Sequence, residues 1–292
     1  MKTREKIGGI LFDVFSYTFF GLFVLSILYI FWNTFVMSIS PEVENTSLAI
    51  RIWPSTLDFS SYHEIWVANK LSGAFFITVY ITLLGTLLHV LLCSMAGYAL
   101  SRPGLPYKNF ILGMILLSMI IPGQMIMVPL FVVYKNLGLI NQIQALIFSG
   151  LVSGFAIIVM RNFFLETPYT IAEAAKIDGA GEWRIFLRIF LPISLPGLAT
   201  ITLFQIVAKW NTFFDGVLFI NDAAKQPLQV VLRSIVAALT NPTPTGSTGA
   251  ASMYGKNMQS AAIIISILPL LIAYPYMQRY FVKGMMVGSI KD

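Results

Sequence analysis

The chain has 292 residues, of which 57% are hydrophobic and only 11% are charged, and its mean hydropathy is +0.78. A soluble domain carries about a quarter of its residues charged, so this composition excludes a soluble globular protein and indicates a membrane protein. The single cysteine, Cys93, excludes an intramolecular disulfide and a cysteine metal cluster, and with only two histidines we expect no catalytic residue and no metal site.

Six apolar stretches are each long enough to cross a bilayer as a helix, which takes about 20 residues. Backbone groups in lipid have to be satisfied within the chain, and since no period-two alternation is present, we expect all six to be helices. The sequence therefore predicts an all-α membrane protein with one domain over residues 1–292. The predicted spans are about 14–38, 73–98, 109–133, 143–164, 193–219 and 259–281.

The positions of lysine and arginine predict the topology, because cytoplasmic loops are enriched in both. With both termini in the cytoplasm, the inner segments hold twelve of these 19 residues and the outer segments hold six, while Lys209 lies within a span. The inner residues are Lys2, Arg4, Lys6, Arg102, Lys108, Arg161, Lys176, Arg184, Arg188, Arg279, Lys283 and Lys291. This asymmetry explains the net charge of +6 as a topology signal, and we expect no binding to nucleic acid.

The first external segment, about 39–72, is rich in aromatic residues such as Trp53 and Trp66, which favours a short structure on the membrane surface. A ligand contact there is the alternative. His63 has no partner at metal-ligand spacing and is expected at the surface. In the second span, small and hydroxyl residues indicate close helix packing, and His89 either lines a translocation path or forms a hydrogen bond to a neighbouring helix.

The third span contains Ile121, Pro122, Gly123 and Gln124 near its middle. Proline removes a backbone donor and bends a helix, so we expect a break here. A break at membrane depth is tolerated only beside protein or a water-filled cavity. We therefore expect Pro122 to Gln124 to face the interior and Gln124 to contact substrate, with a simple packing kink as the alternative.

A polar island at about 168–192 separates the fourth and fifth spans and lies in the cytoplasm in this topology. Thr170 precedes Glu173 by three residues, a capping-box spacing that predicts a helix start. Gly179 is expected to interrupt the helix, and Pro192 is expected to end a second amphipathic turn. A helix–glycine–helix elbow of this kind suits docking to another protein rather than chemistry.

The fifth span is the most polar membrane segment, with Gln205, Lys209, Trp210, Asn211 and Asp215. On a continuous helix Asn211 and Asp215 share a face at a spacing of four residues. A charge in lipid is costly unless it meets water or a partner, so these five residues are predicted to line the outer end of a hydrophilic path. The alternative is an anchor at the outer interface, with Lys209 extending outward.

The external segment at about 220–258 divides into two parts. After Gln226 and Pro227, apolar residues recur on one face from Leu228 to Leu239, which predicts an amphipathic helix. Residues 241–250 lack core-forming side chains and are expected to be mobile. This part either contacts a delivering protein or acts as a tether.

The elbow has the pattern Glu173-Ala174-Ala175-x-x-Asp178-Gly179-Ala180, followed by Phe186, Ile189, Leu191-Pro192 and Pro196. This pattern resembles the cytoplasmic loop signature of permease subunits in binding-protein-dependent ABC importers, and it is most similar to the maltose-type carbohydrate permeases. The resemblance implies the type I ABC importer permease fold, with the elbow as a coupling helix in a cleft of an ATPase subunit. The residues that it assigns to ATPase coupling are Glu173, Ala174, Ala175, Asp178, Gly179 and Ala180.

The resemblance also implies a location in the bacterial plasma (inner) membrane and a set of partners. These are a second homologous permease, two ATPase subunits and an extracytoplasmic solute-binding protein, within the lipid bilayer. The chain has no Walker A motif, so ATP and Mg²⁺ are expected on the ATPase subunits and no cofactor on this chain.

The substrate that the resemblance implies is a sugar, closest to oligosaccharides and including acidic ones such as alginate or other uronate oligomers. Another solute, such as an amino acid or a polyamine, is the alternative. An ion-coupled secondary carrier would require buried acids in several spans, and a membrane-embedded hydrolase would require a facing nucleophile and base. The sequence shows neither pattern.

Overall fold

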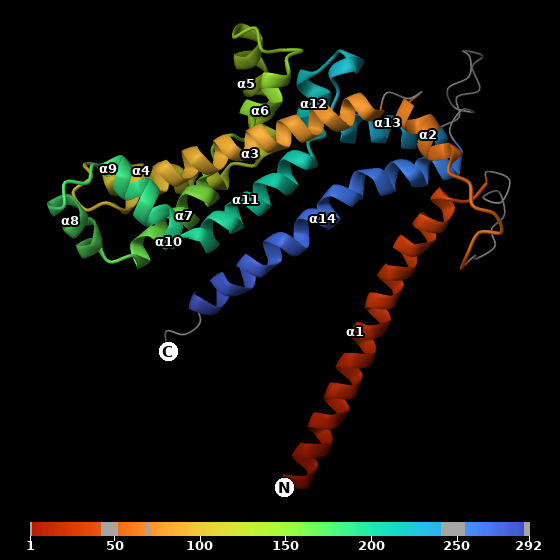
Figure 1. Cartoon of the computed structure of the whole chain (residues 1–292), viewed down its shortest axis with the longest axis horizontal. Coiled ribbons are helices and arrows are strands. Elements are labelled where there is room, and N and C mark those ends of the chain that lie inside the picture. Colours follow the sequence, from red (N-terminus) through yellow and green to blue (C-terminus); the bar gives the residue numbers. More distant parts are fainter. Residues whose placement is uncertain (1, 42–51, 68–70, 241–254, 289–292) are drawn as a thin grey trace. The chain divides into compact units, whose positions relative to one another are not determined.

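The computed structural model describes residues 2–41, 52–67, 71–240 and 255–288, and within these ranges all regular structure is helical (Figure 1). The elements are α1 (Lys2–Ser38), α2 (Ser60–Val67), α3 (Leu71–Ser101), α4 (Lys108–Ile120), α5 (Gly123–Asn136), α6 (Ile143–Phe148), α7 (Gly154–Glu166), α8 (Tyr169–Ile177), α9 (Glu182–Ile185), a π-helical turn (Phe186–Phe190), α10 (Leu191–Ile193), α11 (Leu195–Trp210), α12 (Phe214–Phe219), a 3₁₀ turn (Ala223–Lys225), α13 (Leu228–Thr240) and α14 (Lys256–Gly288). The prediction of an all-α protein is confirmed for the described residues.

The chain divides into two compact units, Met1–Asn69 with Leu232–Ile267 and Lys70–Val231 with Leu268–Asp292. The expectation of one domain over the whole chain stays a prediction.

In the first unit, the segment after α1 is tied back to that helix. The indole N–H of Trp32 donates to the carbonyl of Ile52 at 2.8 Å, and the hydroxyls of Ser38 and Tyr62 share a hydrogen bond of 2.7 Å. The short α2 confirms that part of the first external segment is structured, and His63 is exposed on it, as expected. Its position on the membrane surface stays a prediction.

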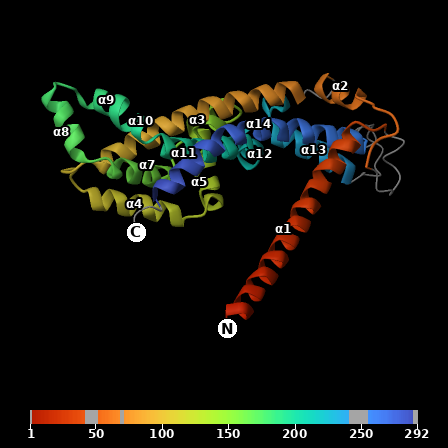
Figure 2. The same ribbon diagram turned by 60° about the horizontal axis from the view of Figure 1, so that its bottom comes forward.

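In the second unit, α3 is the helix against which α7 and α11 pack (Figures 1 and 2). Glycines permit the close approach: a Cβ on Gly97 would lie 2.9 Å from the backbone nitrogen of Arg161 on α7. On the α11 side, a Cβ on Gly85 would lie 3.1 Å from Cε of Lys209. The expectation of close packing through small residues in the second span is therefore confirmed.

The third predicted span is sharply bent. The axes of α4 and α5 differ by 103°, with the break at Ile121 and Pro122, where a break was expected. Pro122, Gly123 and Gln124 are all exposed in this chain, and the expectation that they face an interior cavity stays a prediction. The bend is too sharp for α4 and α5 to share one packing face, and its apex is left without covering side chains.

Two further predicted spans are wrong as continuous helices. The fourth, 143–164, is divided into α6 and α7 by residues 149–153, where Gly150 has a φ of +61°. The fifth, 193–219, ends as α11 at Trp210, and α12 begins only at Phe214. Apolarity alone cannot reveal these breaks, and at the first of them polar side chains from neighbouring helices satisfy the backbone carbonyls.

The number of membrane crossings was predicted as six. Among the described residues, Phe12–Ser38, Leu71–Ser101 and Lys256–Pro275 are each long and apolar enough to cross a membrane, and five crossings result if each of two bent helix pairs is counted as one. The second pair joins Glu182–Ile193 to Leu195–Trp210 with a bend of 82°. Six crossings and cytoplasmic termini stay predictions.

The predicted amphipathic helix after Pro227 is confirmed as α13. Its first residue, Leu228, donates its backbone N–H to the hydroxyl of Thr78 on α3 at 2.8 Å, which satisfies one of the free donors at the helix start. Residues 241–250, expected to be mobile, lie outside the described residues.

Substituting Gly97→Ala tests the α3–α7 contact. The added Cβ has only 2.9 Å to the backbone nitrogen of Arg161, so the two helices have to separate. We expect the free energy of unfolding to fall by about 1 to 3 kcal/mol, measured by thermal unfolding of the purified protein in detergent. Gly113→Ala on α4 is the matched control, because nothing in the described part of the chain lies within 4 Å of its Cβ position. Equal melting of the two variants would contradict the tight contact.

Candidate functional site

The first half of the elbow is α8, which ends at Ile177. After the C-cap residue Asp178, Gly179 has the left-handed conformation, with a φ of +79°. The N–H of Ala180 donates to the carbonyl of Ala175 at 2.9 Å and that of Gly179 to Lys176 at 3.0 Å, which closes the helix end. The predicted interruption at Gly179 is confirmed, since only glycine adopts this φ without strain.

The predicted capping box is wrong. Pro168 occupies the N-cap position of α8, and no side chain among the described residues caps that end. Thr170 already lies inside the helix, one residue after the first helical residue Tyr169, so its hydroxyl is not at the capping position. The fixed φ of Pro168 defines the start of the helix instead.

The second half of the elbow runs through α9, the π-helical turn and α10. Pro192 was predicted to end this half, and that prediction is wrong. The helical run continues to Ile193 and the bend follows at Ser194. In the π-helical turn the N–H of Leu191 already donates five residues back, to Phe186, so the hydrogen-bond ladder has shifted before the proline. The missing N–H of Pro192 therefore falls where a new short helix starts.

The elbow has a buried face and an exposed face. Ala172, Ile185, Phe186 and Phe190 are buried and join the core cluster around α3 and α7. Of the six residues predicted for ATPase coupling, Ala175 and Ala180 are half-buried against this cluster. The other four, Glu173, Ala174, Asp178 and Gly179, are exposed. The structure thus makes these four accessible to a partner, and their role in coupling stays a prediction.

One carboxylate of the elbow was not identified from the sequence. Glu182, the first residue of α9, accepts hydrogen bonds from the hydroxyl of Tyr98 on α3 at 2.9 Å and from Nη2 of Arg102, the residue directly after α3, at 2.8 Å. Its other oxygen lies 2.6 Å from Nζ of Lys176. The spacing of four residues between Tyr98 and Arg102 is only a weak sign that the two act at one site. Glu182 lies 80 residues after Arg102, so no local sequence pattern connects the three.

Electrostatics keep Glu182 charged. The hydrogen bond from the Lys176 ammonium, together with those from Tyr98 and Arg102 and the charge of Arg102, lowers the pKa of Glu182 to about 2 against the opposing effect of partial burial. The stabilisation from these contacts is complete above the ordinary pKa of a glutamate and is lost only as the pH falls through about 2. Because 53% of the side chain is exposed, solvent screening keeps the free energy small, and the contacts mainly fix an orientation.

The second polar cluster surrounds the connection between α6 and α7. Lys209 on α11 donates from Nζ to the carbonyls of Leu146 at 2.6 Å, Ile147 at 3.2 Å and Ser149. These are carbonyls at the C-terminal end of α6, which have no partner within that helix. A cation also suits this end of a helix, where the helix dipole is negative. Lys209 is only 4% exposed and closes α6.

Further side chains continue this arrangement along the connection. Gln205 donates to the carbonyl of Gly150 at 3.4 Å, and Nδ1 of His89 pairs with the carbonyl of Leu151 at 3.0 Å. Since a carbonyl only accepts, Nδ1 of His89 carries the hydrogen. Ser149 in turn donates its hydroxyl to Asp215 at 2.6 Å. Of the two alternatives for His89, the structure shows the hydrogen bond to a neighbouring segment.

The predicted substrate-path residues are therefore divided by the structure. Gln205, Lys209 and Trp210 are buried within this chain, so they form no accessible lining here, and Lys209 does not extend outward. Trp210 packs its ring edge-to-face on Phe75, with centroids 5.8 Å apart.

Three predicted path residues are accessible: Gln124 and Asn211 are exposed and Asp215 is half-buried. Asn211 and Asp215 do not share a helix face, because α11 ends between them. The contribution of these three residues to a path stays a prediction.

These features define a class of protein: a helical membrane protein with sharply bent helix pairs and an exposed helix–glycine–helix elbow between two apolar segments. The chain matches the family described as binding-protein-dependent transport system inner membrane component over residues 89–287, and it belongs to that family. It is thus a multi-pass component of the inner membrane that serves transport rather than catalysis.

Similar proteins include the polygalacturonan/rhamnogalacturonan transport system permease protein YtcP of Bacillus subtilis, with 34% identity over 96% of this chain and 98% of the relative. The arabinooligosaccharides transport system permease protein AraQ of Halalkalibacterium halodurans has 30% identity over 86% of each chain. Among solved structures, a bacterial ABC transporter involved in the import of the acidic polysaccharide alginate is similar, with a TM-score of 0.84 and 29% identity over 93% of this chain and 96% of the other. The chain therefore has the helical fold of an ABC permease.

Replacing Lys209 with methionine tests whether its hydrogen bonds to the C-terminal carbonyls of α6 stabilise the protein. The variant keeps the apolar stem beside Gly85 but leaves the carbonyls of Leu146, Ile147 and Ser149 without their donor. We expect a loss of about 2 to 3 kcal/mol in the free energy of unfolding, measured by thermal unfolding in detergent.

Lys135→Met is the control for this substitution. The Lys135 side chain is exposed and makes no hydrogen bond or ion pair with any part of the chain that the structure describes, so its replacement should leave the melting temperature unchanged. If Lys209→Met and Lys135→Met had the same melting temperature, the Lys209 ammonium would not stabilise the connection between α6 and α7.

Proposed function

We propose that this chain is the membrane-spanning permease subunit of an ATP-driven importer and that it forms, with a second homologous permease, the translocation path for an oligosaccharide. Two ATPase subunits bind ATP and Mg²⁺ and hydrolyse the nucleotide, and this chain holds no cofactor. A solute-binding protein delivers the substrate at the outer face. The single observation that carries the proposal is the exposed elbow, with its family pattern, in a chain that belongs to a transport family.

The coupling step uses the exposed face of α8 and the turn after it. Glu173, Ala174, Asp178 and Gly179 are accessible, and small side chains there allow a partner surface to approach the backbone. Ala172 and Ile185 anchor the same elbow in the core of the second unit. A partner that moves the exposed face therefore also moves the helices beneath it, in the manner of a rigid-body change between inward-open and outward-open states.

The proposed fold is the type I importer permease with six crossings and cytoplasmic termini, which places the elbow on the side where ATP is available. The asymmetry of lysine and arginine supports this orientation. The path runs between the two permeases, and the accessible Gln124, Asn211 and Asp215 are its candidate contacts in this chain. The amides of Gln124 and Asn211 and the carboxylate of Asp215 can form hydrogen bonds with sugar hydroxyls.

The proposed substrate is an acidic oligosaccharide built from uronic acids. A relative with 34% identity is named for polygalacturonan and rhamnogalacturonan, and the similar solved transporter imports alginate. All three polymers carry carboxylated sugars. The arabinooligosaccharide permease shows that neutral sugars occur among similar proteins, so the charge of the substrate is the property to measure.

Docking at the elbow is tested with the double variant Glu173→Ala and Gly179→Pro. Proline cannot adopt the φ of +79° at residue 179, and alanine removes an exposed carboxylate, so the docking face is altered at two points. We expect the ATPase subunits co-expressed with the chain to be lost on affinity purification by about tenfold or more. The melting temperature of the permease itself should stay close to that of the unchanged protein. Full retention of the ATPase subunits would contradict docking at this face.

The substrate class is tested on the solute-binding protein encoded beside this chain. We expect calorimetry to show tight binding of galacturonate or alginate oligomers and weak binding of arabinooligosaccharides of the same length. The physical reason is that a site built for carboxylates leaves a buried cation unpaired when the ligand is neutral, which costs about 2 kcal/mol or more. The reverse preference would assign the importer to neutral sugars.

A further inference from the structure

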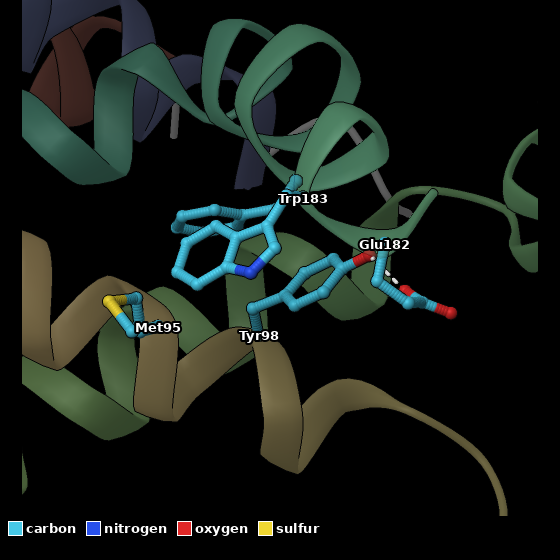
Figure 3. A pocket seen from close by; sticks show the side chains of 5 residues that line it. Met95, Tyr98, Glu182 and Trp183 are labelled. Carbon is cyan, nitrogen blue, oxygen red and sulfur yellow. Dashed lines mark hydrogen bonds between the residues drawn. The ribbon is translucent and has the colours of Figure 1, made fainter. Parts of the chain in front are cut away.

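Besides the apolar core beneath it, the elbow has a polar link to the C-terminal end of α3 through the side chain of Glu182. Glu182 begins α9, its Oε1 lies 2.6 Å from Lys176 on α8, and its Oε2 lies 2.8 Å from Nη2 of Arg102, which directly follows the last residue of α3. Tyr98, one turn earlier on α3, adds a hydrogen bond of 2.9 Å to the same oxygen. Figure 3 shows Tyr98 and Glu182 pointing toward one another across this junction.

Arg102 is held in place for this contact. Its guanidinium lies over the rings of Tyr98 at 4.3 Å, Phe190 at 5.0 Å and Tyr169 at 5.4 Å. Its Nε and Nη1 are buried and have no hydrogen-bond partner among the described residues, which leaves Nη2 as the atom that reaches the carboxylate. Its side chain is only 14% exposed, so the loss of Glu182 would leave a largely buried cation without its counter-ion.

Ring contacts also join the elbow to α3, since Tyr98 packs on Phe186 and Phe190 with ring centroids 5.0 and 5.1 Å apart. Beside Glu182 lies a cavity of about 160 Å³ lined by Met95, Tyr98, Glu182, Trp183 and Phe186 (Figure 3). This cavity is open at the surface, so the side of α9 that carries Glu182 and the exposed Trp183 is less tightly packed than the buried Phe186 beside it. The directional contacts at this edge of the cavity are those of Glu182.

We propose that Glu182 is a positioning residue that makes the elbow and α3 move as one body, so that a displacement imposed on the elbow reaches the helix bundle. This inference rests on the proposed function, because it assumes that the displacement comes from the ATPase subunits. Glu182 itself need not touch them. Its loss should leave docking intact and weaken the transmission of movement.

The orientation of the elbow can be measured in this chain alone. Spin labels on Thr170→Cys in α8 and Leu83→Cys in α3 occupy two exposed positions of the same unit, and Cys93 is buried away from the reagent. We expect a narrow distance distribution in the otherwise unchanged protein and one about twofold broader in Glu182→Gln, which loses the charge but keeps the shape. An unchanged width in Glu182→Gln overturns the inference.

Two further variants separate this role from general destabilisation. Glu166→Gln removes an exposed carboxylate near the start of the elbow that makes no ion pair within the described residues, so its distribution should stay narrow. Glu182→Asp keeps the charge but is one methylene shorter and cannot reach both Lys176 and Arg102, so an intermediate width is expected. Broadening in Glu166→Gln as large as in Glu182→Gln would also overturn the inference.

The link to transport is measured on the whole importer reconstituted with its partner permease, ATPase subunits and binding protein. We expect Glu182→Gln to retain the ATPase subunits while the uptake per ATP hydrolysed falls about threefold, the size of effect typical of a half-exposed charged contact. Unchanged uptake per ATP overturns the inference. If the double variant Glu173→Ala and Gly179→Pro retains the ATPase subunits, the proposed docking is contradicted. The widths of the spin-label distance distributions still decide the role of Glu182 in that case.

Discussion

The second unit depends on how the carbonyls at the α6–α7 break are satisfied. In a bilayer these groups have no water to bind, and an unpaired carbonyl there costs several kcal/mol. Lys209 and Gln205 from α11, with His89 from α3, supply the donors. Gly85 leaves room for the lysine stem, so the break holds α3 and α11 at close range. The break and the packing of these helices therefore depend on one another.

The break also bears on function, because it separates α6 from the helix that leads into the elbow. α7 starts afresh at Gly154, packs on α3 through Gly97 and Met160, and runs directly to α8. α3 thus carries His89 of the polar cluster and, farther along, Tyr98, which contacts Glu182 together with Arg102 just after the helix end. A movement of the elbow that reaches α3 also reaches the helices packed along it.

The polar residues of the fifth predicted span show why a polar side chain in a membrane segment needs a structure before it has a role. Such residues often mark a transport path, and this general expectation placed Lys209 and Gln205 there. Their partners are backbone carbonyls about 55 to 63 residues away, which no sequence pattern displays. Asn211 and Gln124, which the fold leaves exposed, and the half-buried Asp215 remain the predicted path residues that are accessible.

The sequence by itself determined the helical membrane class, the positions of the long spans at α1, α3 and α14, the break at Pro122 and the turn at Gly179, since each follows from local apolarity or from the conformational limits of proline and glycine. The residue pattern of the elbow also determined the family. Only the tertiary structure decided the division of the fourth and fifth spans, the role of Lys209 and the contact between Glu182 and Arg102. The reason is physical: a polar group acquires its function from the partner that folding brings to it, and here those partners are distant in the chain.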